Sequence, residues 1–147
     1  WVGLVGWILG GLAVASAWMA AVGWYVGLVH YPAFRFISAE DWAAFHAHHT
    51  LTTGILVVGP MLGQIVSTFA LIAAIDQLPL WVIVASFVCL ALSVGWTGVV
   101  SGPIHGQLVT KDPALIERLI STNWPRAVAW TAQALIAVVP LLNRSAG

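Results

Sequence analysis

Charge and cysteine are the two things this sequence has least of. Charged residues make up 7 % of the 147-residue chain and hydrophobic residues 61 %, whereas an ordinary soluble domain has about 25 % charged residues. Five basic and five acidic side chains cannot cover the surface of a water-soluble protein of this size, so we expect the chain to be solvated by lipid. The formal net charge is zero, which gives no basic surface for a nucleic-acid partner.

The lack of cysteine excludes two further classes of protein. Cys89 is the single cysteine, so neither an internal disulfide nor a cysteine-based zinc site is expected. The chain begins with Trp1 rather than methionine, and we therefore expect further residues to precede it. The first apolar stretch is too long for the core of a signal peptide and has no positively charged start, so we interpret it as a membrane span.

What the sequence does contain is long apolar runs. Each is about 20 residues or more, the length that crosses a bilayer as a helix. Short connections make neighbouring helices antiparallel. We therefore predict an all-α integral membrane protein, an antiparallel bundle of four transmembrane helices in one domain (1–147), located in a bacterial inner membrane. The four runs cover about residues 2–29, 51–75, 80–100 and 124–142.

Cap and breaker residues set the expected helix ends. Pro32 should end the first helix, because the residue before a proline is pushed out of helical geometry. Ser38 and Asp41 form a capping-box pattern that starts the second helix. Asp112 is a helix cap followed by proline, which predicts a short amphipathic helix before the last span, and Asn123 repeats the signal.

Histidine and basic residues gather at one end of this expected bundle. All five histidines lie there, three of them in the stretch FHAHHT, and four of the five basic residues lie at the same end. The excess of positive charge predicts that the histidine end faces the cytoplasm. The histidines are His30, His46, His48, His49 and His105.

Each span carries one stripe of small or polar residues at helical spacing. Polar side chains inside a membrane usually face the interior of a bundle, so we expect the stripes to converge on one pocket. His48 should point away from it, and Trp130 should point inward. The alternative is that the histidines lie hydrated among lipid headgroups and that Arg126 snorkels. The expected pocket residues are His30, His46, His49, His105, Asn123 and Arg126.

Two cofactor hypotheses follow from the histidines. His46 and His49, three residues apart on one helix face, can reach one metal ion, with His30, His105 or Glu40 completing a copper, iron or zinc site. An open coordination position would make such a site catalytic, acting on an apolar small molecule that enters from the bilayer.

The second hypothesis is a haem or a chlorophyll-type tetrapyrrole held by His105 or His30 beside Trp130, with Arg126 on a propionate or carbonyl. The chain would then be a pigment-carrying or purely structural subunit of a larger photosynthetic or respiratory membrane complex, packed against other subunits or copies of itself. A transporter is disfavoured, because no carboxylate lies in mid-membrane and no internal duplication is visible.

Several short motifs carry a resemblance. They are Tyr31-Pro32-Ala33-Phe34, His46-x-x-His49, Pro103-Ile104-His105 and Asn123-Trp124-x-Arg126-x-x-x-Trp130. Together they resemble a family of small bacterial four-helix membrane proteins. The second half is also distantly similar to the anthrone oxygenase-like membrane proteins.

That resemblance implies oxygenation of an aromatic or quinol-like molecule in the membrane. Only Asn123, Trp124 and Arg126 match the shared pattern, and the histidine-rich start of the second helix departs from it. On this basis we expect a metal-binding oxidoreductase of oxygenase type. Arg126 would be its catalytic residue, holding an anionic or carbonyl oxygen, and Asn123 would orient it.

Overall fold

The computed structural model describes residues 3–145, and within that range the chain is helical with no strand. Four helical segments, 28 to 33 residues long, are long and apolar enough to cross a membrane. The expected start of the first span at Val2 lies outside the described residues. The segments are Leu4–Phe36, Trp42–Ala74, Leu80–Gln107 and Pro113–Asn143.

Each segment is assembled from shorter helical elements. The first contains α1 (Leu4–Tyr25), the π-helical turn η1 (Val26–His30), α2 (Tyr31–Ala33) and the 3₁₀ turn η2 (Phe34–Phe36). The second contains α3 (Trp42–Ala70) and the 3₁₀ turn η3 (Leu71–Ala74). The third contains α4 (Leu80–Leu90), the π-helical turns η4 (Ala91–Gly95) and η5 (Thr97–Ser101), and α5 (Gly102–Gln107). The fourth contains α6 (Pro113–Ser121) and α7 (Trp124–Ser145).

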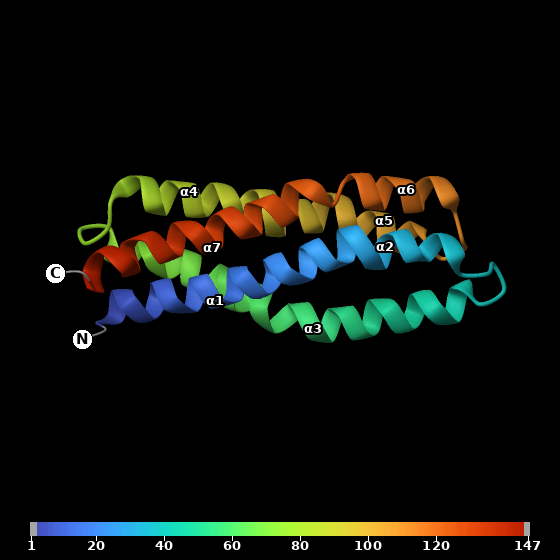
Figure 1. Cartoon of the computed structure of the whole chain (residues 1–147), viewed down its shortest axis with the longest axis horizontal. Helices are drawn as coiled ribbons and strands as arrows, with labels where there is room; N and C mark the ends of the chain where they lie inside the picture. The colour runs from blue at the N-terminus through green and yellow to red at the C-terminus, as the bar shows by residue number, and fades with distance from the viewer. Residues whose placement is uncertain (1–2, 146–147) are drawn as a thin grey trace.

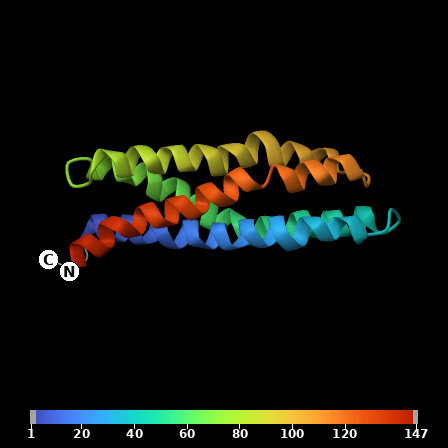
Figure 2. The ribbon, with the colours of Figure 1, turned by 45° about the horizontal axis from the view of Figure 1, so that its top comes forward.

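The segments lie side by side along the long axis of the molecule (Figures 1 and 2). One end holds the start of α1, the end of α7 and the connection 75–79, and the other end holds the connection 37–41 and the link between α5 and α6 (Figure 1). α1 packs mainly against α7 and α3, and α7 also packs against α4. The histidine end is therefore the end of the 37–41 connection.

Pro32 does not act as the sequence pattern indicated. The prediction that the first helix ends at Pro32 was wrong, because the chain stays helical to Phe36. A π-helical turn, Val26–His30, stands directly before Pro32, and two such turns precede Pro103. A π turn relaxes the i→i−4 hydrogen-bond pattern, so the missing proline N–H is accommodated without ending the helix.

Two caps do act as the pattern indicated. The Ser38 hydroxyl accepts from the Asp41 backbone N–H at 3.0 Å, and α3 begins at the next residue. The Asp112 carboxylate accepts from the first-turn amides of α6. Ile116 and Leu119 of α6 are buried whereas Glu117 is exposed, which makes α6 the expected short amphipathic helix.

Apolar clusters fill both ends of the molecule and leave the polar groups between them. Trp42 is locked into the cluster at the histidine end, since its indole Nε1 donates to the Leu108 carbonyl at 2.9 Å. At the opposite end the cluster contains Val5, Leu9, Leu12, Leu71, Ala74, Leu78, Ile83 and Ala137. At the histidine end it contains Val26, Tyr31, Phe34, Trp42, Ile104, Leu108, Ile116 and Leu119.

Candidate functional site

Four of the five histidines come together between the segments. His30 Nε2 lies 2.8 Å from His49 Nδ1, and His46 Nε2 lies 3.3 Å from His105 Nδ1. The ring centres of His49 and His105 are 5.2 Å apart, so the two pairs form one cluster. His48 is exposed and makes no contact with the other ring nitrogens. The structure thus brings these four histidines together. His48, expected to point away from the pocket, lies outside this cluster but lines the groove between the first segment and α3.

Aromatic rings hold the imidazoles in place. The Trp42 ring stacks on His46 with an interplanar angle of 16°, and Phe45 stacks on His49 at 11°. The edge of Phe34 meets the face of His49 with 5.0 Å between ring centres. Packing of this kind fixes ring orientation, so the hydrogen-bond directions in the cluster are set by the protein.

Arg126 lies next to the cluster and is buried. Its guanidinium donates to Asn123 Oδ1 and to the Tyr31 hydroxyl, both at 2.9 Å, and to Thr97 Oγ1 at 3.5 Å. Arg126 is 7 % exposed and Asn123 is 3 % exposed. Snorkelling to the surface is therefore not what this side chain does.

No carboxylate among residues 3–145 pairs with Arg126. The ion pair found in that range joins Arg35 and Glu117 on the surface. Removing a charge from water costs several kcal/mol unless an opposite charge and hydrogen bonds replace the water. Arg126 has the hydrogen bonds and lacks the opposite charge, so the site favours an anionic oxygen next to it.

The fixed donors of Arg126 set the direction of a hydrogen-bond chain. Arginine only donates, so the Tyr31 hydroxyl accepts from Arg126 and is free to donate its own proton to His105 Nε2 at 3.0 Å. His105 then carries its proton on Nδ1 and donates to His46. The reverse direction would leave the buried Tyr31 hydroxyl proton without an acceptor, a costly arrangement at 3 % exposure.

Two glycines on one face of the first segment allow its backbone to approach the fourth segment closely. A Cβ on Gly27 would lie 2.3 Å from Asn123 Nδ2, and a Cβ on Gly23 would lie 3.0 Å from the Trp130 ring. The Asn123 amide uses this space to donate to the Gly23 carbonyl at 2.9 Å. Asn123, expected as a helix cap, thus joins the first segment to Arg126 through its two side-chain atoms.

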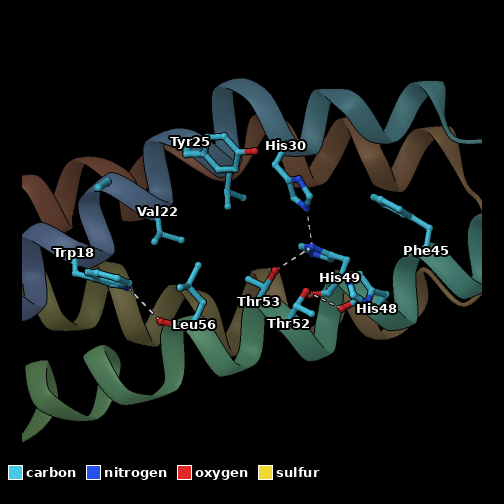
Figure 3. A pocket seen from close by; sticks show the side chains of 12 residues that line it. Trp18, Val22, Tyr25, His30, Phe45, His48, His49, Thr52, Thr53 and Leu56 are labelled. Atoms are coloured by element: carbon cyan, nitrogen blue, oxygen red, sulfur yellow. Dashed lines mark hydrogen bonds between the residues drawn. The ribbon is translucent and has the colours of Figure 1, made fainter.

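Two cavities meet at the histidine cluster. The outer groove, about 450 Å³, lies between the first segment and α3, with Trp18, Tyr25 and His30 facing Phe45 and Leu56 across it (Figure 3). The inner cavity, about 200 Å³, lies inside the bundle and is lined on its polar side by Tyr31, His49, Thr53, Ser101, His105 and Arg126. Trp130 also lines the inner cavity, which agrees with its expected inward position.

Two side-chain atoms of residues that line the inner cavity have no hydrogen-bond partner within residues 3–145. His49 Nδ1 contacts both His30 and Thr53 (3.1 Å) (Figure 3), whereas its Nε2 has no hydrogen-bond partner within residues 3–145. The Ser101 hydroxyl is buried and unpartnered. Both residues line the inner cavity, so a ligand there would find one cation, one free imidazole nitrogen and one free hydroxyl.

A second polar network lies deeper in the bundle and is closed on itself. Trp130 Nε1 donates to Gln64 Oε1 at 2.9 Å, Gln64 Nε2 donates to Ser93 and to Gln133, and Gln133 Nε2 donates to Thr68 at 3.0 Å. Both glutamines are fully buried. Because its members satisfy one another, this network holds the second, third and fourth segments in register.

The hydrogen bonds of the imidazole rings bear on the metal hypothesis. Five of the eight imidazole nitrogens in the cluster are used in hydrogen bonds to one another and to Tyr31, among them both nitrogens of His105. In the described part of the chain no group of three or more His, Cys, Asp or Glu side chains is placed to hold a metal ion. Glu40 is exposed in the 37–41 connection. A metal ligand set therefore does not fit these side chains as they are arranged.

Tyr31 is the site residue that sequence reasoning about the polar stripes missed. It lies at the centre of the network, between Arg126 and His105. A tyrosine next to a proline in an apolar stretch is also typical of a membrane-interface anchor, and the stripes consist of small and strongly polar residues only. The available signal was its position directly after His30 at the end of the small-residue face.

Comparison of the chain with protein-family models, curated protein sequences and solved structures finds no match.

Proposed function

We propose that this chain is an integral membrane enzyme of oxidoreductase type, oxygenase-like, that acts on an apolar molecule taken from the bilayer. The observation that carries the proposal is Arg126, a buried cation that pairs with no carboxylate of residues 3–145 and lines the inner cavity together with His49. A site of this kind binds an oxygen that becomes negatively charged during a reaction.

Membrane insertion as an antiparallel bundle is part of the proposal. Large apolar side chains are exposed on the flanks of the segments, for example Trp7 at 73 %, Ile55 at 75 % and Val99 at 73 %. A contiguous apolar surface is unstable in water and marks a membrane or protein contact. The four segments have the length and apolarity that a bilayer requires. The orientation of the histidine end toward the cytoplasm stays a prediction from the distribution of basic residues.

His49 is the residue we assign as proton acceptor. With its ring proton on Nδ1 and directed at His30 Nε2, His49 presents Nε2 as a base. A general base oriented by a hydrogen bond from its other nitrogen is a recurring catalytic arrangement. His30 then acts as a positioning residue, since it fixes which nitrogen of His49 is basic.

Arg126 is assigned to the oxyanion that proton removal creates. Preorganised donors of this kind contribute several kcal/mol when water is excluded. Asn123 holds the guanidinium at Nε, which leaves N–H groups on the other two nitrogens for a ligand. The oxyanion of a hydroxylated ring can then donate an electron pair, through a ring carbon, to dioxygen dissolved in the bilayer, the oxidant that the resemblance to anthrone oxygenase-like proteins suggests. A C–O bond forms, the O–O π bond breaks, and the proton held by His49 passes to the outer oxygen of the resulting ring hydroperoxide.

No step of the proposed reaction involves a metal or a tetrapyrrole. Ligation of either group through the nitrogens that join His30 to His49 and His46 to His105 would require those hydrogen bonds to open. Elemental analysis and an absorption spectrum of the protein, purified gently in lipid nanodiscs, test both groups directly. A stoichiometric metal or a Soret band would replace the acid–base role of the histidines with a ligand role.

The decisive experiment measures binding and oxygen uptake with a membrane-soluble phenol. Arg126→Gln should weaken binding about 100-fold, equal to about 2.8 kcal/mol, the order expected for a hydrogen-bonded charge pair that loses one partner. Arg118→Gln is the matched control, because Arg118 is exposed on α6. Equal affinity in the Arg126 variant and the control would refute the proposal.

Adjacent histidines give a second matched pair. His49→Ala should abolish oxygen uptake with unsubstituted phenol, whereas His48→Ala should leave it unchanged, because His48 lies outside the cluster and lines the outer groove but not the inner cavity that holds Arg126. His49 is buried and His48 is exposed, so the melting temperature of each variant in detergent is measured alongside, to separate a loss of fold from a loss of activity. Equal loss in the two variants would contradict the role assigned to His49.

A further inference from the structure

The two cavities differ in size, and a permanently charged side chain, Arg126, lines only the smaller one. The inner cavity of about 200 Å³ also holds the unpartnered Ser101 hydroxyl. The outer groove of about 450 Å³ is lined by apolar and aromatic side chains together with histidines and threonines. Four residues line both cavities, so the two adjoin along these side chains, which are Val22, Val26, His49 and Thr53.

The volume of the inner cavity limits what its polar groups can hold. An apolar cavity of about 150 Å³ is known to hold one benzene molecule. A cavity of about 200 Å³ therefore has room for one six-membered ring with its oxygen substituents, and not for three fused rings. Arg126 and Ser101 would meet the oxygens, and Trp130 and Met19 would line the ring.

The outer groove has the shape and rim of a site for an apolar chain. It runs along the first segment and α3, with Trp18 near one end and Phe45 near the other (Figure 3). Its rim includes large exposed apolar side chains, Tyr25 at 57 % and Leu56 at 45 %. In a membrane this rim would face lipid, so a chain in the groove would continue into the bilayer.

We infer that the substrate is a tailed amphiphile: a single oxygen-bearing ring that occupies the inner cavity, joined to an apolar tail that lies in the outer groove. The inference rests on the proposed function and narrows its substrate class. His49 and Thr53 would lie at the junction of ring and tail, because they line both cavities. A flat tricyclic substrate, which the resemblance to anthrone oxygenase-like proteins would suggest, does not fit this division.

The test uses four probes: a benzoquinol with a ten-carbon tail, the same ring with a methyl group, a hydroxylated tricyclic arene, and decanoic acid. Binding of each is measured by equilibrium dialysis against protein in lipid nanodiscs, corrected for protein-free nanodiscs. We expect both single-ring probes to bind, with the tricyclic arene and decanoic acid at least tenfold weaker. Equal or tighter binding of the tricyclic arene or of decanoic acid would overturn the inference.

Two filling variants separate the cavities. Ala21 lines only the outer groove, so Ala21→Phe should weaken binding of the tailed ring at least tenfold and leave the methyl-substituted ring unchanged. Ala17→Phe, one turn away on the exposed face of α1, is the control. An unchanged affinity of the tailed ring in Ala21→Phe would refute the assignment of the tail.

Gly54 lines only the inner cavity, and a Cβ there meets nothing within 4 Å. Gly54→Leu should therefore abolish binding of both rings. Gly59→Leu also points into open space but lines neither cavity, so binding of both rings should be unchanged in that variant.

The outcomes separate the substrate class from the proposed function. If binding of the rings depends on Arg126 but the affinity of the tailed ring is unchanged by Ala21→Phe, the substrate class fails and the proposed function stands. If no probe binding depends on Arg126, both fail.

Discussion

Gly27→Ala tests the link between helix packing and the site most directly. A Cβ at position 27 would lie 2.3 Å from Asn123 Nδ2, and real Cβ contacts are essentially never below 3.0 Å. The Asn123 amide must therefore move by at least 0.7 Å, the difference between these two distances. That movement breaks its bond to the Gly23 carbonyl and disturbs its bond from Arg126 Nε.

The magnitude follows from the bonds that are lost. A neutral hydrogen bond contributes about 1 kcal/mol and one to a charged group about 1.5–3 kcal/mol. Alanine in place of glycine stabilises a helix by about 1 kcal/mol, which offsets part of this loss. We therefore expect Gly27→Ala to destabilise the fold by about 2 kcal/mol and to weaken binding of the methyl-substituted ring, because Arg126 is no longer held.

Thermal unfolding in detergent and equilibrium dialysis measure the two effects. Gly10→Ala in α1 is the control, because a Cβ there meets nothing within 4 Å. In an Asn123→Ala background the clash is absent, so the further cost of Gly27→Ala should vanish, which a double-mutant cycle would record. The reasoning is refuted if Gly27→Ala behaves like Gly10→Ala, or if its cost persists in that background.

Three other substitutions give predictions of different size. Trp130→Phe leaves Gln64 Oε1 without the indole donor, and we expect a loss of about 1–3 kcal/mol in unfolding free energy. Asp112→Ala removes the cap of α6 and should cost about 1 kcal/mol, visible in the same thermal assay. Arg35→Ala breaks an exposed ion pair with Glu117, and its melting temperature should match that of the parent at every salt concentration, since exposed pairs contribute little.

The helix faces could be predicted from the sequence because they depend only on spacing within one helix. His46, His49 and Thr53 lie at steps of three and four, and α3 is regular through all of them. The same is true of Arg126, Trp130 and Gln133 in α7, at steps of four and three. The period of the α-helix alone places such residues on one side.

The contacts between helices could not be predicted in the same way. The π-helical turn Val26–His30 changes the rotation of the first segment before Tyr31, and no α-helical spacing rule includes that change. His30 is the last residue of that turn and lines the outer groove, and Tyr31 directly after it enters the network around Arg126.

The strongest evidence for a ligand is the charge of Arg126 rather than any unpaired hydroxyl. Ser16 and Ser86 also have buried hydroxyls without a partner, and neither lines one of the two cavities. A serine hydroxyl without a bond costs about 1–3 kcal/mol, an amount that packing elsewhere can offset. A buried guanidinium without an anion costs more. In the nearby glutamine network each side-chain amide group has a hydrogen-bond partner, whereas Arg126 lies beside a cavity without an anion among residues 3–145. The best explanation for this buried charge is therefore an anionic oxygen of a ligand that completes the site.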